Sequence, residues 1–109
     1  MRAVQVQFAI DDDARGDAIV ADLLQRRLVA CAQMVGPVTS RYWWRGSIER
    51  ATEWMFLCKT TPERLEAVIE CIRSQHPYEV PEIVASDITG GLETYVDWIV
   101  DETRPKPPA

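Results

Sequence analysis

The chain has 109 residues, of which 47% are hydrophobic and 27% charged, and these values are typical of a single globular domain. Its net charge of −5 and its pI near 4.8 disfavour contact with phosphate backbones and anionic lipid, so we expect neither nucleic-acid nor membrane partners. The apolar runs are all shorter than the roughly 20 residues that a membrane-spanning helix needs.

The N-terminal part of the chain reads as a strand followed by a helix. Apolar and polar residues alternate over 3–10, which predicts a strand rather than the apolar core of a signal peptide. The three aspartates at 11–13 favour the start of a helix. We expect this helix over 13–27, with Arg26 and Arg27 in its last turn, where cations interact well with the helix dipole.

A long hairpin is expected next. Residues 31–44 are rich in β-branched and aromatic side chains, which favours a strand, and Gly36-Pro37 should bend or bulge it. Arg45-Gly46 predicts a tight reversal, because glycine tolerates the positive φ that such turns need. The chain should then return as a strand over 47–60.

The second half repeats the helix-then-strand order. A capping box of Thr60 and Glu63 should begin a helix that ends near Gln75, because Pro77 disfavours helical geometry in the residue before it. The remaining elements are expected as a strand within 81–88, a break at Gly90-Gly91, a short helix marked by Leu92, Tyr95, Val96 and Ile99, and a loose tail over 103–109.

This order, β-α-β-β-α-β with a terminal helix, predicts an α+β fold of the ferredoxin-like type. Its antiparallel sheet should carry two helices on one face. The domain should span 1–102, with 103–109 as a flexible tail.

The strand over 47–60 also predicts an oligomer. It is apolar on both faces, because Phe56 and Cys58 point one way while Met55 and Leu57 point the other. Two helices cover only one face, and the second apolar face indicates an interface. The aromatic residues of the hairpin that should add to it are Tyr42, Trp43 and Trp44. The alternative is that these aromatics pack under the terminal helix of the same chain.

Three cysteines, an odd number without a C-x-x-C motif, favour free thiols in a reducing, cytoplasmic environment. Cys58 and Cys71 fall among apolar residues and should be core residues. Cys31, where the first helix leads into the second strand, is the most plausible reactive thiol.

Five segments between residues 3 and 100 carry a specific combination of motifs: Leu28–Ala32, Thr39–Glu49, Leu57–Thr61, His76–Ile83 and Tyr95–Ile99. The pattern S-x-Y-x-W-x-G-x-I followed by H-P-Y-x-V-P-E-I resembles the signature blocks of the CutA family, the divalent-cation tolerance proteins. The resemblance implies a ferredoxin-like subunit in a tight trimer, similar in shape to the PII signalling proteins, with the long hairpins packed on neighbouring subunits. It also implies an association with copper.

The copper pattern of the family is incomplete in this sequence. Family members described as copper binders carry a cysteine late in the first strand and two adjacent histidines before Pro-Tyr. The matching positions in this sequence, by that resemblance, are Phe8, Gln75 and His76. We therefore expect only weak binding of copper or another divalent cation, with His76 and Cys31 as candidate ligands. The alternative for His76 is a cap at the end of the second helix.

Four polar residues of the signature blocks are candidates for a small-ligand site at a subunit boundary: Tyr42, Lys59, Tyr78 and Glu82. The alternatives are a solvated strand end for Lys59 and a rim salt bridge for Glu82.

The leading interpretation is a non-enzymatic cytosolic homotrimer linked to divalent-cation tolerance. The second is a PII-like regulatory or adaptor trimer that binds a small molecule or protein in its clefts. The third is a hydrolase or transferase that uses Cys31 or the region of His76 and Glu82.

Overall fold

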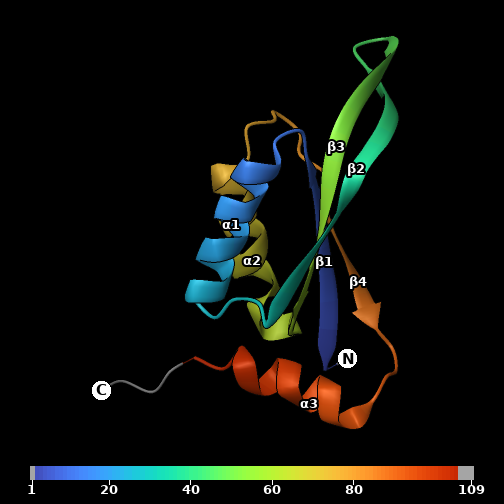
Figure 1. Ribbon diagram of the computed structural model, residues 1–109. Coiled ribbons are helices and arrows are strands. Elements are labelled where there is room, and N and C mark those ends of the chain that lie inside the picture. Colours follow the sequence, from blue (N-terminus) through green and yellow to red (C-terminus); the bar gives the residue numbers. More distant parts are fainter. Residues whose placement is uncertain (1, 106–109) are drawn as a thin grey trace.

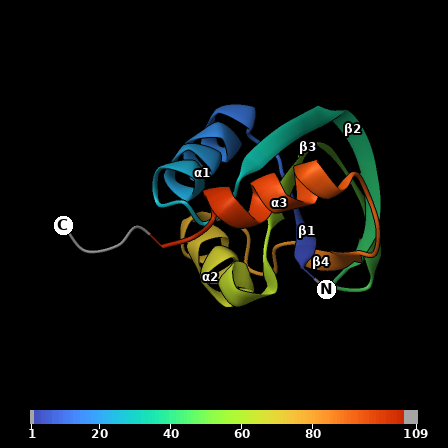
Figure 2. The same cartoon turned by 90° about the horizontal axis from the view of Figure 1, so that it is seen from below.

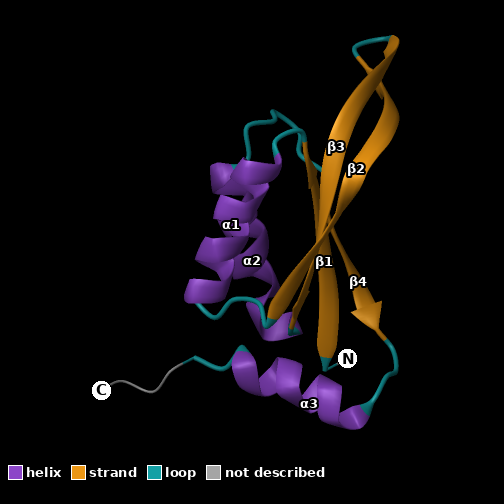
Figure 3. Ribbon diagram, in the orientation of Figure 1, coloured by secondary structure: helices purple, strands orange, loops and turns teal. Residues whose placement is uncertain are grey.

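The computed structural model of the chain describes residues 2–105 and has the predicted ferredoxin-like α+β architecture. A four-stranded antiparallel sheet, in the order β2-β3-β1-β4, carries α1 and α2 on one face (Figures 1 and 3). The elements are β1 (Ala3–Ile10), α1 (Asp13–Gln25), β2 (Cys31–Trp44), β3 (Ser47–Thr60), the 3-10 helix η1 (Pro62–Arg64), α2 (Leu65–Gln75), β4 (Ile83–Ile88) and α3 (Glu93–Glu102). No helix among these residues is both long and apolar enough to cross a membrane.

Helix α1 begins as predicted but ends two residues early. The Asp12 side chain accepts a hydrogen bond from the Arg15 amide at 3.2 Å and caps the first turn. At the other end, Arg27 adopts a left-handed φ of 54°, and the Leu28 amide donates to the Leu23 carbonyl at 2.9 Å. This is a Schellman-type ending, so the prediction that Arg26 and Arg27 occupy the last helical turn is wrong.

Helix α2 begins without the predicted capping box. Thr60 belongs to β3, and its hydroxyl donates to the Leu28 carbonyl at 2.6 Å instead of capping a helix. The N-cap residue of η1, Thr61, makes no side-chain capping bond. The end of α2 at Gln75 is as predicted, because the residue before Pro77 is extended, with ψ of 136°.

Strands β2 and β3 form the expected hairpin and project well beyond the rest of the sheet (Figure 1). A bulge between Val35 and Val38 marks Gly36-Pro37. Both residues of the Arg45-Gly46 turn have positive φ, 49° and 83°, which is the turn that matches the twist of a two-residue hairpin. Because Ile10, the last residue of β1, pairs with Trp54, residues 47–53 of β3 pair with β2 alone among the strands of the described residues.

The core lies between the sheet and the two helices. The rings of Phe8 and Phe56 stack there with centroids 5.0 Å apart, and Cys58 is fully buried beside them. Met55 and Leu57 are half-buried on the opposite face, so the predicted two-sided character of this strand is confirmed.

Helix α3 lies across the end of the sheet that is remote from the hairpin (Figures 1 and 2). The alternative in which the hairpin aromatics pack under the terminal helix is therefore wrong. The Thr103 side chain is buried and its carbonyl accepts from Arg64 Nε at 2.8 Å, so the packed domain extends past residue 102. The rest of the predicted tail, 106–109, lies outside the described residues.

Replacing Gly16 should test this packing. It lies in α1, and a Cβ there would be 2.2 Å from Phe56 Cε1, far inside contact distance. Alanine gains about 1 kcal/mol of helix propensity over glycine, but overpacking a core costs about 1–3 kcal/mol. We expect Gly16→Ala to lower the free energy of unfolding in urea by up to about 2 kcal/mol at fixed protein concentration, the difference between these two terms.

Gly90→Ala is the matched control, because a Cβ at Gly90 would meet no other atom within 4 Å. It should stay within about 0.5 kcal/mol of the wild type. A Gly16→Ala variant as stable as the control would contradict the close approach of α1 to Phe56.

Candidate functional site

A groove of about 740 Å³ runs along the projecting part of the hairpin, as far as the residues next to its turn. One wall is the part of β2 and β3 that extends past β1. The other is segment 78–82, which follows α2 and is kept out of helical geometry by Pro77 and Pro81. The residues that line the groove are Asp11, Ser40, Arg41, Tyr42, Trp43, Trp44, Ala51, Glu53, Tyr78, Glu79, Val80, Pro81 and Glu82.

The most buried polar residue of the groove is Glu53, whose exposed fraction is 7%. Tyr78 donates its hydroxyl to Glu53 Oε2 at 2.9 Å. Burial, then this hydrogen bond and the charge of Glu53, hold the pKa of the Tyr78 hydroxyl well above its ordinary value, so it stays a neutral donor. Within residues 2–105, Tyr78 is the one group that hydrogen-bonds this carboxylate, and it does so through Oε2 alone.

The aromatic side chains of the hairpin supply the other wall. Tyr42 and Trp44 are partly exposed, and Trp43 is 72% exposed. The guanidinium carbon of Arg45 lies 5.3 Å from the centre of the Trp44 ring, and Arg45 Nη2 also contacts Glu79 Oε2 at 3.1 Å. An aromatic face and a carboxylate thus already hold one cation beside the groove.

Three of the four residues predicted as a small-ligand site line this groove: Tyr42, Tyr78 and Glu82. Glu82 accepts from Gln7 Nε2 at 3.0 Å rather than forming the predicted rim salt bridge. Lys59 is not part of the groove. It lies at the other end of β3, where its ammonium donates to Gln33 Oε1 at 3.2 Å.

His76 lies behind the groove and is buried, so the sequence-based candidate ligand is not exposed. Its Nδ1 accepts from the Tyr78 amide at 3.2 Å, which places the ring proton on Nε2, and Nε2 then donates to the Ala9 carbonyl at 2.7 Å. Neither ring nitrogen has a lone pair free for a metal. His76 is the C-cap residue of α2, as the alternative expected, and its backbone amide donates to the Arg73 carbonyl at 3.4 Å. Its ring, however, bonds β1 rather than the carbonyls of α2.

The structure does not bring the two candidate metal ligands together. Cys31 pairs with Lys59, which in turn pairs with Gln5, so Cys31 lies level with Gln5 of β1. His76 contacts Ala9, which is four residues, or about 13 Å, further along β1. The half-buried Cys31 thiol instead lies 3.6 Å from the Tyr95 hydroxyl. Among residues 2–105, no three His, Cys, Asp or Glu side chains gather closely enough to hold a metal ion.

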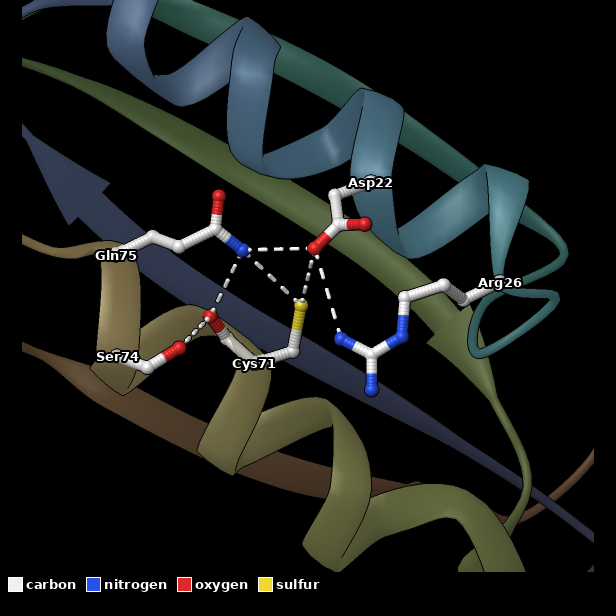
Figure 4. A network of polar contacts seen from close by, with 5 residues as sticks. All are labelled: Asp22, Arg26, Cys71, Ser74 and Gln75. Atoms are coloured by element: carbon white, nitrogen blue, oxygen red, sulfur yellow. Dashed lines mark hydrogen bonds and ion pairs between the residues drawn. The ribbon is translucent and has the colours of Figure 1, made fainter.

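The other positions of the family copper pattern have different roles here. Phe8 is a core residue, and its ring meets the His76 ring edge-on. The Gln75 amide donates to Asp22 Oδ2 at 2.9 Å and to the Cys71 carbonyl at 3.2 Å (Figure 4). It therefore ties α2 to α1, a connection that the sequence does not reveal because Asp22 is 53 positions away and outside any amphipathic pattern.

Asp22 collects several donors in this network between the helices (Figure 4). The Cys71 thiol donates to its carboxylate at 3.4 Å, and this bond lowers the pKa of Asp22 more than the contacts from Gln75 and Arg26 do. Burial, followed by the bond to Asp22, raises the pKa of Cys71. Burial also raises the pKa of Cys58 to about 12. Both thiols stay protonated near neutral pH, as expected of structural cysteines.

The Tyr78–Glu53 hydrogen bond should be important for stability. Tyr78→Phe removes the donor from a carboxylate that is nearly buried, and a lost partner of this kind costs about 1–3 kcal/mol. We expect a corresponding fall in the free energy of unfolding. Tyr95→Phe is the control, because its hydroxyl is near a weak sulfur partner and 43% of the residue is exposed, and it should change stability by less than about 0.5 kcal/mol. Equal effects of the two changes would contradict a special role for Tyr78.

The sequence and the fold both match known proteins. The family model described as CutA1 divalent ion tolerance protein matches residues 4–102. The divalent-cation tolerance protein CutA of Citrobacter koseri is 35% identical over 97 residues, which cover 89% of this chain and 84% of that protein. The crystal structure of CutA from Xylella fastidiosa superposes with a TM-score of 0.92 at 31% identity, covering 95% of this chain and 100% of that one. The divalent cation tolerance protein of Thermus thermophilus superposes with a TM-score of 0.90 at 33% identity, covering 94% of this chain and 99% of that one. The chain therefore belongs to the CutA1 divalent ion tolerance family.

Proposed function

We propose that this chain is a homotrimeric cytosolic protein that supports divalent-cation tolerance by binding rather than by catalysis. The observation that carries the assembly is the hairpin, whose apolar side chains are largely left exposed by the rest of residues 2–105. Trp43 and Ile48 are 72% and 65% exposed, and Val35 is 47% exposed on the sheet face that faces away from α1 and α2. Apolar exposure of this extent marks an interaction surface. The family resemblance points to three copies.

The hairpin also leaves main-chain groups to be satisfied. Residues 47–53 of β3 lack a neighbour on one side, and β4 is an edge strand with Val84 53% exposed. Unpaired edges with apolar side chains are uncommon in proteins that remain monomeric. Assembly through the hairpin would cover both the ring surfaces and the free edge.

Light scattering should give a mass of three times the 12.4 kDa chain, and Trp43→Ala should lower that mass or the melting temperature. The ring contacts little in its own chain, so its loss reports contacts with a neighbour. Truncating a tryptophan that a neighbour buries costs about 3–5 kcal/mol. Leu92→Ala is the control, because Leu92 is equally exposed, at 72%, and is the N-cap residue of α3, the helix at the end of the sheet remote from the hairpin. A monomeric wild type, or a Trp43→Ala trimer with unchanged melting, would argue against hairpin-mediated assembly.

Any copper site of this protein should be weak. Two of the three family positions, Phe8 and Gln75, are occupied by groups committed to the core and to the contact between helices. His76 would have to release the Tyr78 amide or the Ala9 carbonyl before it could bind a metal. Cys31, half-buried and near the surface, is the donor that remains.

Copper(II) is added to reduced protein under nitrogen at pH 7. Its affinity should be at least about tenfold lower than the affinity of a site with one cysteine and two histidines. Each absent ligand costs more than the ~1.4 kcal/mol of binding free energy that a factor of ten represents. In calorimetry, His76→Ala should leave the affinity unchanged, whereas Cys31→Ser should reduce it. Tight binding, or binding that disappears with His76, would show that the ring rearranges to meet the metal.

A second candidate function is that of a PII-like regulatory trimer with a small-molecule site. The groove along the hairpin favours it, because about 740 Å³ is within the usual size of ligand sites and Tyr42, Tyr78 and Glu82 gather there. The third interpretation, an enzyme built on Cys31, gains no support from the geometry, because His76 lies at the far end of β1 and its ring nitrogens are engaged.

A further inference from the structure

We propose that segment 104–109 of one copy of the chain docks in the groove of a neighbouring copy. This segment reads Arg-Pro-Lys-Pro-Pro-Ala, and its last four residues lie outside the described part of the chain. The inference deepens the leading proposed function and rests on it, because it states what covers the groove once the subunits assemble. The site is incomplete in a single chain, and the neighbour supplies the missing part.

Opposite charge favours this occupant. The groove is lined by four carboxylates and one guanidinium, those of Asp11, Glu53, Glu79, Glu82 and Arg41. Segment 104–109 carries two cations and no acidic residue, although the chain as a whole has a net charge of −5. A neighbour with a net negative charge approaches an acidic groove at an electrostatic cost, and a basic segment at the point of contact lowers that cost.

The proline content of the segment matches the aromatic wall of the groove. Three of its six residues are proline, and proline-rich segments dock in aromatic-lined grooves in the polyproline II conformation. The rings that line the groove are those of Tyr42, Trp43, Trp44 and Tyr78. Polyproline II has three residues per turn, so Pro105 and Pro108 would share the face toward these rings. Indole N–H groups are donors that can bond the carbonyls such a segment leaves free.

The point from which the segment starts is fixed. The Thr103 side chain is buried, and the Thr103 carbonyl accepts from Arg64 Nε at 2.8 Å. Arg104, the next residue, contacts Asp101 at 3.3 Å, but both side chains are mostly exposed. An exposed ion pair of this kind contributes little to stability. Arg104 can therefore exchange Asp101 for a carboxylate of the groove at little cost.

The groove that receives the segment belongs to another copy. Thr103 is held by Arg64, four positions beyond Thr60 at the end of β3, whereas the groove residue of β3 closest to that end is Glu53. Seven residues of strand correspond to about 23 Å.

Six residues span at most about 22 Å even when fully extended, so the segment is too short to lie along the groove of its own chain. This agrees with the position of α3 at the end of the sheet remote from the hairpin (Figure 1). In a ring of identical subunits each contact joins two different surfaces, so the end of one chain can meet the hairpin of the next.

Nuclear magnetic resonance on the full-length, assembled protein tests the docking. Copies with two different isotope labels are refolded together, and NOE contacts are selected that arise only between copies. They should connect the proline protons of one copy to the rings of Trp43 and Trp44 in another. The amide of Lys106 should have an order parameter near the value of about 0.85 that is typical of a rigid backbone.

Two double variants separate docking from a general effect of charge. Arg104→Gln combined with Lys106→Gln should abolish the contacts to the rings and lower the order parameter at position 106 below about 0.6. Arg26→Gln combined with Arg73→Gln is the matched control, because it removes the same charge from two exposed positions outside the groove. The control should keep both the contacts and the order parameter. Melting curves show whether each variant is folded.

The inference is overturned by a wild-type order parameter below about 0.6 at position 106, or by ring contacts that survive in the variant without the two cations. It is also overturned if another part of the neighbour, or a residue of the same chain, makes the contacts to the rings. Light scattering on the same samples identifies which proposal has failed. A trimer with an undocked segment overturns only the docking, whereas a monomeric wild type overturns the assembly as well.

Discussion

The length mismatch between neighbouring strands is the constraint on which the rest of the structure depends. β1 has 8 residues and β3 has 14, and their register ends where Ile10 meets Trp54. Everything that distinguishes this protein from a plain two-layer domain lies past that point. The hairpin becomes a free arm, one edge of β3 stays unpaired, and segment 78–82 can approach the exposed flank of β3 to form a groove. The arm and the groove are two consequences of one short strand.

A chain of hydrogen bonds connects the end of that short strand to the groove. The Ala9 carbonyl accepts from His76, the His76 ring accepts from the Tyr78 amide, and the Tyr78 hydroxyl donates to Glu53. Each step fixes the next, because His76 has no rotational freedom once both nitrogens are engaged. The motif histidine thus acts as a positioning residue for the groove. Its burial explains why the only histidine of the chain is a poor metal ligand.

The sequence predicted well those features that repeat with a regular period. Alternation in β1, the β-branched and aromatic run of β2 and the turn at Arg45-Gly46 depend on local patterns, and the structure has all of them. Contacts that depend on side chains far apart in the sequence could not be predicted. Glu53 looks like an exposed residue of an amphipathic strand, yet Tyr78 buries it from 25 positions away. Within one chain Lys59 lies apart from Tyr42 for a related reason, because membership of the same motif set says nothing about position along a 14-residue strand.

The metal and groove proposals are physically connected through Tyr78. If copper took the Nδ1 lone pair of His76, the Tyr78 amide would lose its acceptor, and the segment that carries the phenol to Glu53 would lose its anchor. A ligand that needs Glu53 and Tyr78 in place would then favour the conformation in which His76 is unavailable. Because linkage is reciprocal, occupancy of His76 by a metal would weaken the groove ligand by the same factor. Copper bound through Cys31, about 13 Å along the sheet, would leave this chain of hydrogen bonds intact. In a protein with both proposed sites, the identity of the metal ligand would therefore decide whether the two ligands compete or coexist.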